Sequence, residues 1–167
     1  MNNKITGSLA CLASVFSAMA AQAQVKDQAF KNWTVYSTTV DAKKVCYMTS
    51  YPTKKTGNTK QRGLGYFIVT NISNTKDETS VSSGYPYQPG SKVSVTFDNN
   101  KNYSMSLIKD EIAWIKNEKT EKEFIGQLKM RKSMNVKGIS AKGTYSVDQY
   151  TLAGFSSAYS RMKALCK

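Results

Sequence analysis

The chain has 167 residues, with 24 Lys or Arg, 11 Asp or Glu and no His, which gives a formal net charge of +13. The absence of histidine excludes Ser-His-Asp and Cys-His catalysis and any ordinary histidine-based metal site. The 3 cysteines are too few for the usual four-ligand structural zinc site, and we expect neither a metal nor another cofactor.

Residues 1–23 have the layout of a secretory signal peptide. Lys4 gives a short basic start, residues 5–20 are apolar or small and uncharged, and Ala21-Gln22-Ala23 fits an A-x-A cleavage site. The apolar run is short and rich in Ala and Ser, which favours a signal peptide over a membrane anchor. We expect cleavage after Ala23, a periplasmic or secreted location, and one mature domain over residues 24–167.

Short strand-like runs fill the first two-thirds of the mature chain. They alternate in polarity, are rich in β-branched and aromatic residues, and are separated by turn residues. The sequence DAKK at 41–44 predicts a hairpin turn, and the polar segment 52–63, which contains Pro and Gly, predicts a mobile basic loop. The predicted strands are 32–40, 44–51, 64–72, 79–87, 92–99, 103–108 and 111–115.

The pattern then changes to a helical period. Thr120 and Glu123 have the spacing of a capping box. Apolar residues follow at helical intervals, which predicts an amphipathic helix over 120–132 with Phe124, Ile125, Leu128 and Met130 toward the core. Strand alternation returns in 133–140 and 143–152.

The last segment predicts a second helix over 154–166. Its apolar residues share one face that should pack on a sheet, namely Phe155, Ala158, Tyr159, Met162, Leu165 and Cys166. Many short strands with regular turns, and two short helices, predict a mainly β fold. We expect an antiparallel β-sandwich or barrel-like domain.

Two cysteines remain after signal cleavage, Cys46 and Cys166. In an exported chain an even pair of cysteines is typical of one disulfide, which here would close a long loop. The alternative is a reactive Cys46 thiol. It is disfavoured because Cys46 lies in a predicted strand, has no C-x-x-C partner and has no histidine to activate it.

The sequence GFSSA at 154–158 resembles the G-x-S-x-G nucleophile elbow, with Ser156 as the nucleophile. Ala158 replaces the final glycine, no histidine can activate the serine, and the elbow belongs to a parallel α/β sheet. Gly154 is better interpreted as a strand-to-helix turn. A Ser–Lys mechanism through Ser106–Lys109 or Ser160–Lys163 is also disfavoured, because lysine is abundant and we expect Ser160 and Lys163 on the outer helix face.

Acidic residues offer only one local pair, Asp110 and Glu111. Adjacent side chains point apart on a strand or a helix, so this pair is poorly suited to acid–base catalysis. Two carboxylates brought together by folding, in a sugar cleft lined by some of the 10 tyrosines, stay open as an alternative. More often, tyrosines of an exported β protein cover sheet faces.

The mature chain keeps a net charge of +12, because residues 1–23 contain one Lys and no acid. The basic residues are scattered, with no dense run of the kind that reads nucleic acid. Such charge commonly serves solubility alone; the alternative is attraction to anionic envelope polymers or host surfaces. The candidate contact surface is the basic segment 52–63 with nearby tyrosines: Lys54, Lys55, Lys60, Arg62, Tyr51, Tyr85 and Tyr87.

Several stretches together resemble one protein family. They are KVCY at 44–47, GYP at 84–86, AW at 113–114 and the block VKGISAKGTYSVDQYTLAGFSSA at 136–158, followed by Cys166. In this order they resemble the invasion-associated locus B family of alphaproteobacteria. The resemblance implies an exported, non-catalytic envelope protein with a mainly β fold and a role in host-cell entry or survival, or in envelope integrity. It supplies no catalytic residue.

Overall fold

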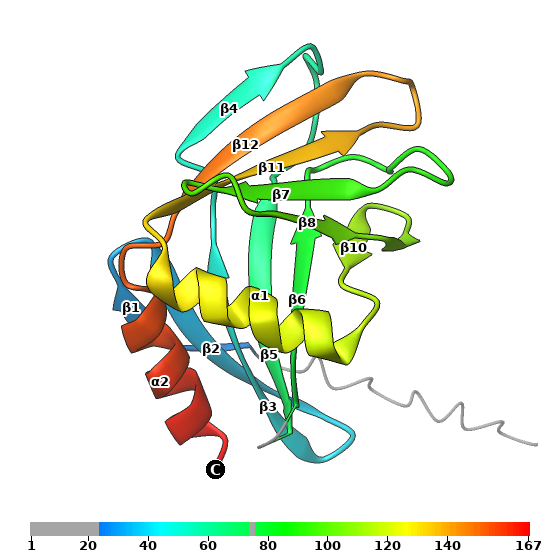
Figure 1. Ribbon diagram of the computed structural model, residues 1–167. Helices are drawn as coiled ribbons and strands as arrows, with labels where there is room; N and C mark the ends of the chain where they lie inside the picture. The colour runs from blue at the N-terminus through cyan, green and yellow to red at the C-terminus, as the bar shows by residue number, and fades with distance from the viewer. Residues whose placement is uncertain (1–23, 74–75) are drawn as a thin grey trace, which may run out of the picture.

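The computed structural model describes residues 24–73 and 76–167. These residues form two antiparallel sheets and two helices (Figure 1). The sheets stay separate, so the mainly β sandwich with two short helices is confirmed and the barrel alternative is not. The signal peptide predicted for residues 1–23 lies outside the described residues.

The larger sheet has seven strands in the order β1-β2-β3-β5-β6-β10-β9. The DAKK hairpin between β2 and β3 is confirmed, and Asp41 and Ala42 both have positive φ (49° and 60°), as a tight hairpin turn requires. The strands are β1 (Val25–Phe30), β2 (Trp33–Val40), β3 (Lys43–Ser50), β5 (Tyr66–Ser73), β6 (Lys76–Ser82), β10 (Ile112–Trp114) and β9 (Leu107–Lys109).

The smaller sheet has five strands in the order β4-β12-β11-β7-β8. The prediction of a mobile loop over 52–63 was wrong for its centre, because β4 pairs with β12 through contacts such as Thr56 to Val147. The polar sequence KKTG has no apolar alternation to reveal a strand. These strands are β4 (Lys54–Gly57), β12 (Tyr145–Thr151), β11 (Ser133–Ile139), β7 (Val93–Phe97) and β8 (Asn102–Met105).

The core lies between the two sheets and beneath the helices. Alternate residues of each strand point inward, as period-two patterning requires; Val35, Met48 and Phe67 are fully buried from one sheet and Val136 and Tyr150 from the other. Two aromatic rings meet the Trp33 ring edge-on, at centroid distances of 6.1 Å and 4.9 Å, and they belong to Phe67 and Phe155.

Helix α1 (Glu118–Met130) starts two residues before the predicted position. Its cap is Asn117 and not Thr120, because the Asn117 side chain accepts hydrogen bonds from the backbone N–H groups of Lys119 and Thr120. Phe124, Ile125 and Leu128 are buried as predicted. Met130 is 63% exposed, so its predicted place toward the core was wrong.

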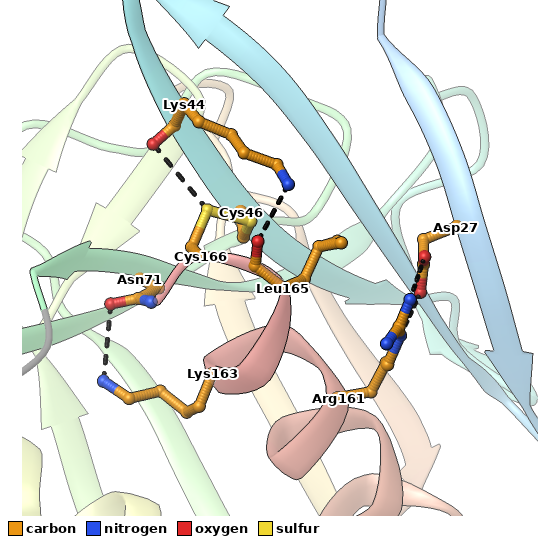
Figure 2. Close-up of a disulfide and its surroundings, with 8 residues drawn as sticks. All are labelled: Asp27, Lys44, Cys46, Asn71, Arg161, Lys163, Leu165 and Cys166. Atoms are coloured by element: carbon orange, nitrogen blue, oxygen red, sulfur yellow. Dashed lines mark hydrogen bonds and ion pairs between the residues drawn. A yellow bond between two sulfur atoms is a disulfide. The ribbon is translucent and has the colours of Figure 1, made fainter.

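Helix α2 (Phe155–Leu165) lies against β1, β2 and β3, and the apolar face predicted for it is confirmed (Figure 1). Cys166 directly follows the helix and forms a disulfide with Cys46 of β3, with a Cα–Cα distance of 5.8 Å. Figure 2 shows that the Lys44 ammonium also donates a hydrogen bond to the Leu165 carbonyl, at 2.8 Å. Neither helix in the described part of the chain is long and apolar enough to cross a membrane.

Candidate functional site

The predicted contact residues do not form one surface. Lys54, Lys55 and Lys60 are exposed, and Tyr51 is 48% exposed. Arg62, Tyr85 and Tyr87 are largely or fully withdrawn from solvent, so the prediction that they form part of an exposed contact surface was wrong.

Arg62 forms a two-pronged ion pair with Asp148 of β12. The Arg62 guanidinium nitrogens lie 2.6 Å and 2.5 Å from the two Asp148 carboxylate oxygens, and the side chains are only 9% and 1% exposed. The hydrogen bonds that the Arg62 guanidinium donates to Asp148 raise the pKa of Arg62. This pair holds the segment after β4 against the smaller sheet and is not free to bind an external anion.

Tyr85 and Tyr87 belong to a buried polar cluster beside this ion pair. The Tyr85 hydroxyl shares a hydrogen bond with Ser146 at 2.7 Å, and the Tyr87 hydroxyl donates to Ser83 at 3.0 Å. Burial raises the pKa of Tyr87, so its hydroxyl keeps its proton. Gly138 faces the cluster, where a side-chain carbon would lie 2.7 Å from the Tyr87 ring. The GYP and VKG motifs therefore meet in the interior.

The outward side of the smaller sheet is polar and basic. We call it the outer face: residues Lys54, Thr56, Ser94, Thr96, Asn102, Ser104, Ser133, Asn135, Lys137, Tyr145, Val147, Gln149 and Thr151. Among these outward positions no side chain is acidic. The Lys137 ammonium lies 5.3 Å from the centre of the Tyr145 ring, a cation–π contact. A depression of about 140 Å³ is lined by five residues of this face, including Lys54, Asn135 and Gln149.

Three carboxylates, those of Asp77, Glu118 and Glu121, line a groove between α1, α2 and β6. This helix groove has a volume of about 280 Å³, and both Glu121 and Asp77 line it. Glu121 accepts a hydrogen bond from the Thr79 backbone N–H at 2.9 Å, and burial raises the pKa of Glu121 to about 7. Asp77 accepts hydrogen bonds from the Tyr159 hydroxyl at 2.5 Å and the Lys163 ammonium at 3.0 Å.

The residues of the disfavoured serine mechanisms lie apart from this groove or have other contacts. Ser156 is exposed, and its hydroxyl donates to the Lys129 carbonyl at 3.4 Å. Lys163 is 22% exposed and paired with Asp77, so its predicted place on the outer helix face was wrong. Asp110, with a positive φ of 52°, lies in the turn between β9 and β10. Within residues 24–73 and 76–167, no three His, Cys, Asp or Glu side chains are placed to hold a metal ion.

A scan against protein-family models matches residues 33–163 to the invasion associated locus B protein family. The chain belongs to the invasion-associated locus B family. The match runs from Trp33, at the start of β2, to Lys163 in α2, and so includes strands of both sheets. Searches of curated proteins and of solved structures gave no match.

In this invasion-associated locus B protein the motifs that carry the resemblance contribute to the buried structure, although the block 136–158 also supplies the exposed Lys137 and Tyr145. Ser83, Tyr85 and Gly138 belong to the buried cluster, and Ala113 and Phe155 belong to the hydrophobic core. Cys166 lies just beyond the matched residues but joins Cys46 within them, and such a disulfide fits an extracytoplasmic location.

Proposed function

We propose that this protein is an exported, non-catalytic interaction module that binds an anionic polysaccharide of the bacterial envelope or the host surface. The observation that supports the proposal is the outer face, where lysines and neutral hydrogen-bonding groups occur without any acidic side chain. In contrast, the acid nearest to the predicted basic segment, Asp148, is buried and neutralised by Arg62. The charge of the outer face is therefore available to a partner.

The physical basis is an array of hydrogen-bond donors on the outward side of the smaller sheet. Lys54 lies on β4, an exposed strand at the end of the smaller sheet (Figure 1). Lys137 lies two strands away on β11. An extended polymer with phosphate or carboxylate groups can lie along this face, and the hydroxyl and amide groups between the lysines can bond its neutral parts.

The test compares two charge-reversed variants of the mature protein. In the first, Lys54 and Lys137 are changed to Glu; in the matched control, two other exposed lysines, Lys116 and Lys119, are changed to Glu. Both variants have the same net charge. Binding to phosphate-bearing envelope polysaccharide, and to a sulfated host glycan, is measured at low and at moderate salt.

We expect the first variant to bind about tenfold more weakly, because two contacts of roughly 0.5–1 kcal/mol each are lost. The control should bind like the parent, and added salt should weaken binding by the parent. Equal losses in both variants would reduce the effect to net charge and overturn the proposal. The preferred polysaccharide decides between an envelope role and a host-surface role.

A second candidate function is carboxylate-dependent hydrolysis in the helix groove. One observation favours it: Glu121, with a pKa raised to about 7, shares the groove with Asp77, and a general acid works best with a pKa near the working pH. The test is a screen with chromogenic glycosides. Hydrolysis that Glu121→Gln abolishes, while Glu123→Gln preserves it, would favour the enzyme; no hydrolysis would argue against it.

A purely structural role in the envelope is tested genetically. A deletion strain with normal host entry but increased sensitivity to detergent would favour envelope integrity over host interaction. Complementation by the charge-reversed variant would then show that the outer face is not needed for that role.

A further inference from the structure

A cavity of about 600 Å³ lies where the chain crosses between the two sheets. Three segments line it: 59–61, which leads from β4 to β5; 84–86, which leads from β6 to β7; and 140–144, the turn between β11 and β12. We call it the crossing pocket. Its volume falls in the usual range for small-molecule sites, about 300–1,000 Å³.

Hydrogen bonds fix the walls of the crossing pocket in place. The Thr59 hydroxyl donates to the Thr144 hydroxyl at 2.9 Å, and the Ala141 backbone N–H donates to the Pro86 carbonyl at 2.8 Å. The Gly63 backbone N–H donates to the Gly84 carbonyl at 2.8 Å, just beyond the pocket. All three segments are therefore joined to one another, and the pocket is formed before any ligand arrives.

The lining has three chemical parts: an apolar wall, two lysines, and the uncharged polar side chains of Thr59, Gln61, Ser140 and Thr144. Tyr85, Pro86 and Ala141 supply apolar wall, and the Tyr85 hydroxyl is turned to Ser146. Lys60 and Lys142, which are both exposed, come from two different segments of the lining. No acidic side chain of the described chain lines it.

We propose that the crossing pocket binds an anionic amphiphile, a single alkyl chain that carries a phosphate. The chain lies against the apolar wall, and the phosphate lies between the ammonium groups of Lys60 and Lys142. Two lysines without a neighbouring carboxylate match a compact, doubly charged anion, since lysine binds phosphate as a point charge. A sugar is a poorer match, because the hydroxyls of Thr59, Ser140 and Thr144 already hydrogen-bond one another.

The pocket does not share its lining with the outer face, so the two proposals can fail separately. The probe is dodecyl phosphate, used below the concentration at which it forms micelles. Binding to the mature protein is followed by backbone amide NMR shifts and by calorimetry. Inorganic phosphate and dodecyl maltoside, which carry the charge and the chain separately, are run beside it.

We expect saturable binding of dodecyl phosphate, with the largest shifts at residues 59–61, 84–86 and 140–144. The double variant Lys60→Ala, Lys142→Ala should bind about tenfold or more weakly, because charge-assisted contacts are lost. Ala141→Trp, which fills the pocket from the exposed hairpin, should block binding. The control Lys116→Ala, Lys119→Ala and the charge-reversed outer-face variant should both bind like the parent.

Equal affinity for inorganic phosphate would show that the apolar wall contributes nothing, and equal affinity for dodecyl maltoside would show that the lysines contribute nothing; either result overturns the proposal. Unchanged binding by the double-lysine variant also overturns it. The lysines are exposed, so this variant should fold normally, and it decides the matter even if Ala141→Trp does not fold.

Discussion

Arg62 shows how far a residue type can mislead about exposure. An arginine in a polar, lysine-rich segment predicts a solvated side chain, yet Arg62 is paired with Asp148 inside the molecule. The two residues are 86 positions apart, so no local pattern links them. The same limit applies to Tyr85 and Tyr87: the sequence suggests surface tyrosines, whereas the fold turns both into the interior. The exposed lysines, in contrast, were correctly predicted as exposed.

Loss of the Arg62 guanidinium should destabilise the protein strongly. Arg62→Met leaves the Asp148 carboxylate buried without its partner, and we expect the free energy of unfolding to fall by about 3–5 kcal/mol. Denaturant unfolding measures it. Lys60→Met, two residues earlier and exposed, should change stability by less than about 0.5 kcal/mol. Similar values for the two variants would contradict the buried pair.

Glu121 should make stability depend on pH near neutrality. Burial raises its pKa from 4.5 to about 7, and Glu78 and Asp77 add to this effect. The folded state therefore binds a proton more tightly than the unfolded state, so this contribution is complete below about pH 4.5 and is lost as pH rises through about 7. The other charged or titratable groups that line the groove around Glu121 are Lys76, Glu118, Lys122, Lys129, Tyr159 and Lys163.

Glu121→Gln removes this titration and keeps an acceptor for the Thr79 N–H. At pH 8 we expect the variant to be more stable than the parent by on the order of 2–3 kcal/mol, and at pH 4 the two should be nearly equal. Thermal unfolding across this range measures the difference. Glu123→Gln, an exposed site on the same helix, serves as control. A stability difference between Glu121→Gln and the parent that stays the same from pH 4 to pH 8 would contradict the prediction.

At the scale of elements, periodic apolar residues were the reliable signal. Strand β2 was predicted over 32–40 and is found over Trp33–Val40, and α2 was predicted over 154–166 and is found over Phe155–Leu165. Strand β1 was not predicted, and β4 was taken for a loop. Both are edge strands, and each is held by the backbone of one neighbour. Half of VKDQAF is polar, and KKTG has no apolar side chain.

The turn before α2 depends on Gly154. Its φ of +93° is rarely adopted by other residues, and a side-chain carbon there would lie 2.0 Å from the Phe30 carbonyl oxygen. Gly154→Ala should therefore lower stability at least about twice as much as Gly90→Ala, which has a positive φ of +74° but no neighbour within 4 Å. Denaturant unfolding compares them; equal effects would show that the contact with Phe30 is unimportant.

At the scale of the molecule, the sequence predicted an antiparallel sandwich or barrel-like fold but not its topology. The chain moves between sheets five times along its length, with β4 and β12 paired although 91 positions separate Thr56 and Val147. Strand patterns carry no information on such distant pairings. For the same reason the sequence could not predict the outer face, the helix groove or the crossing pocket, since each joins segments from different parts of the chain.

The Cys46–Cys166 disulfide should contribute substantially to stability. It closes a loop of 120 positions, for which chain entropy gives an upper figure of about 4–5 kcal/mol. The double variant Cys46→Ala, Cys166→Ala should lose up to this amount in denaturant unfolding but should keep α2, because Phe155, Ala158 and Met162 stay buried in the core. Reductant should destabilise the parent and leave the variant unchanged. Two alkylatable thiols in the native exported protein would contradict the bond.

The positions of the two cysteines in the sequence also determine when the disulfide can form during export. As the chain is exported N-terminal end first, the partner of Cys46 arrives last, because Cys166 follows every strand and both helices in the sequence. No other cysteine exists in the described chain, so oxidation has only one intramolecular outcome and needs no reshuffling of wrong pairs. The closed disulfide therefore indicates that the end of α2 has reached β3.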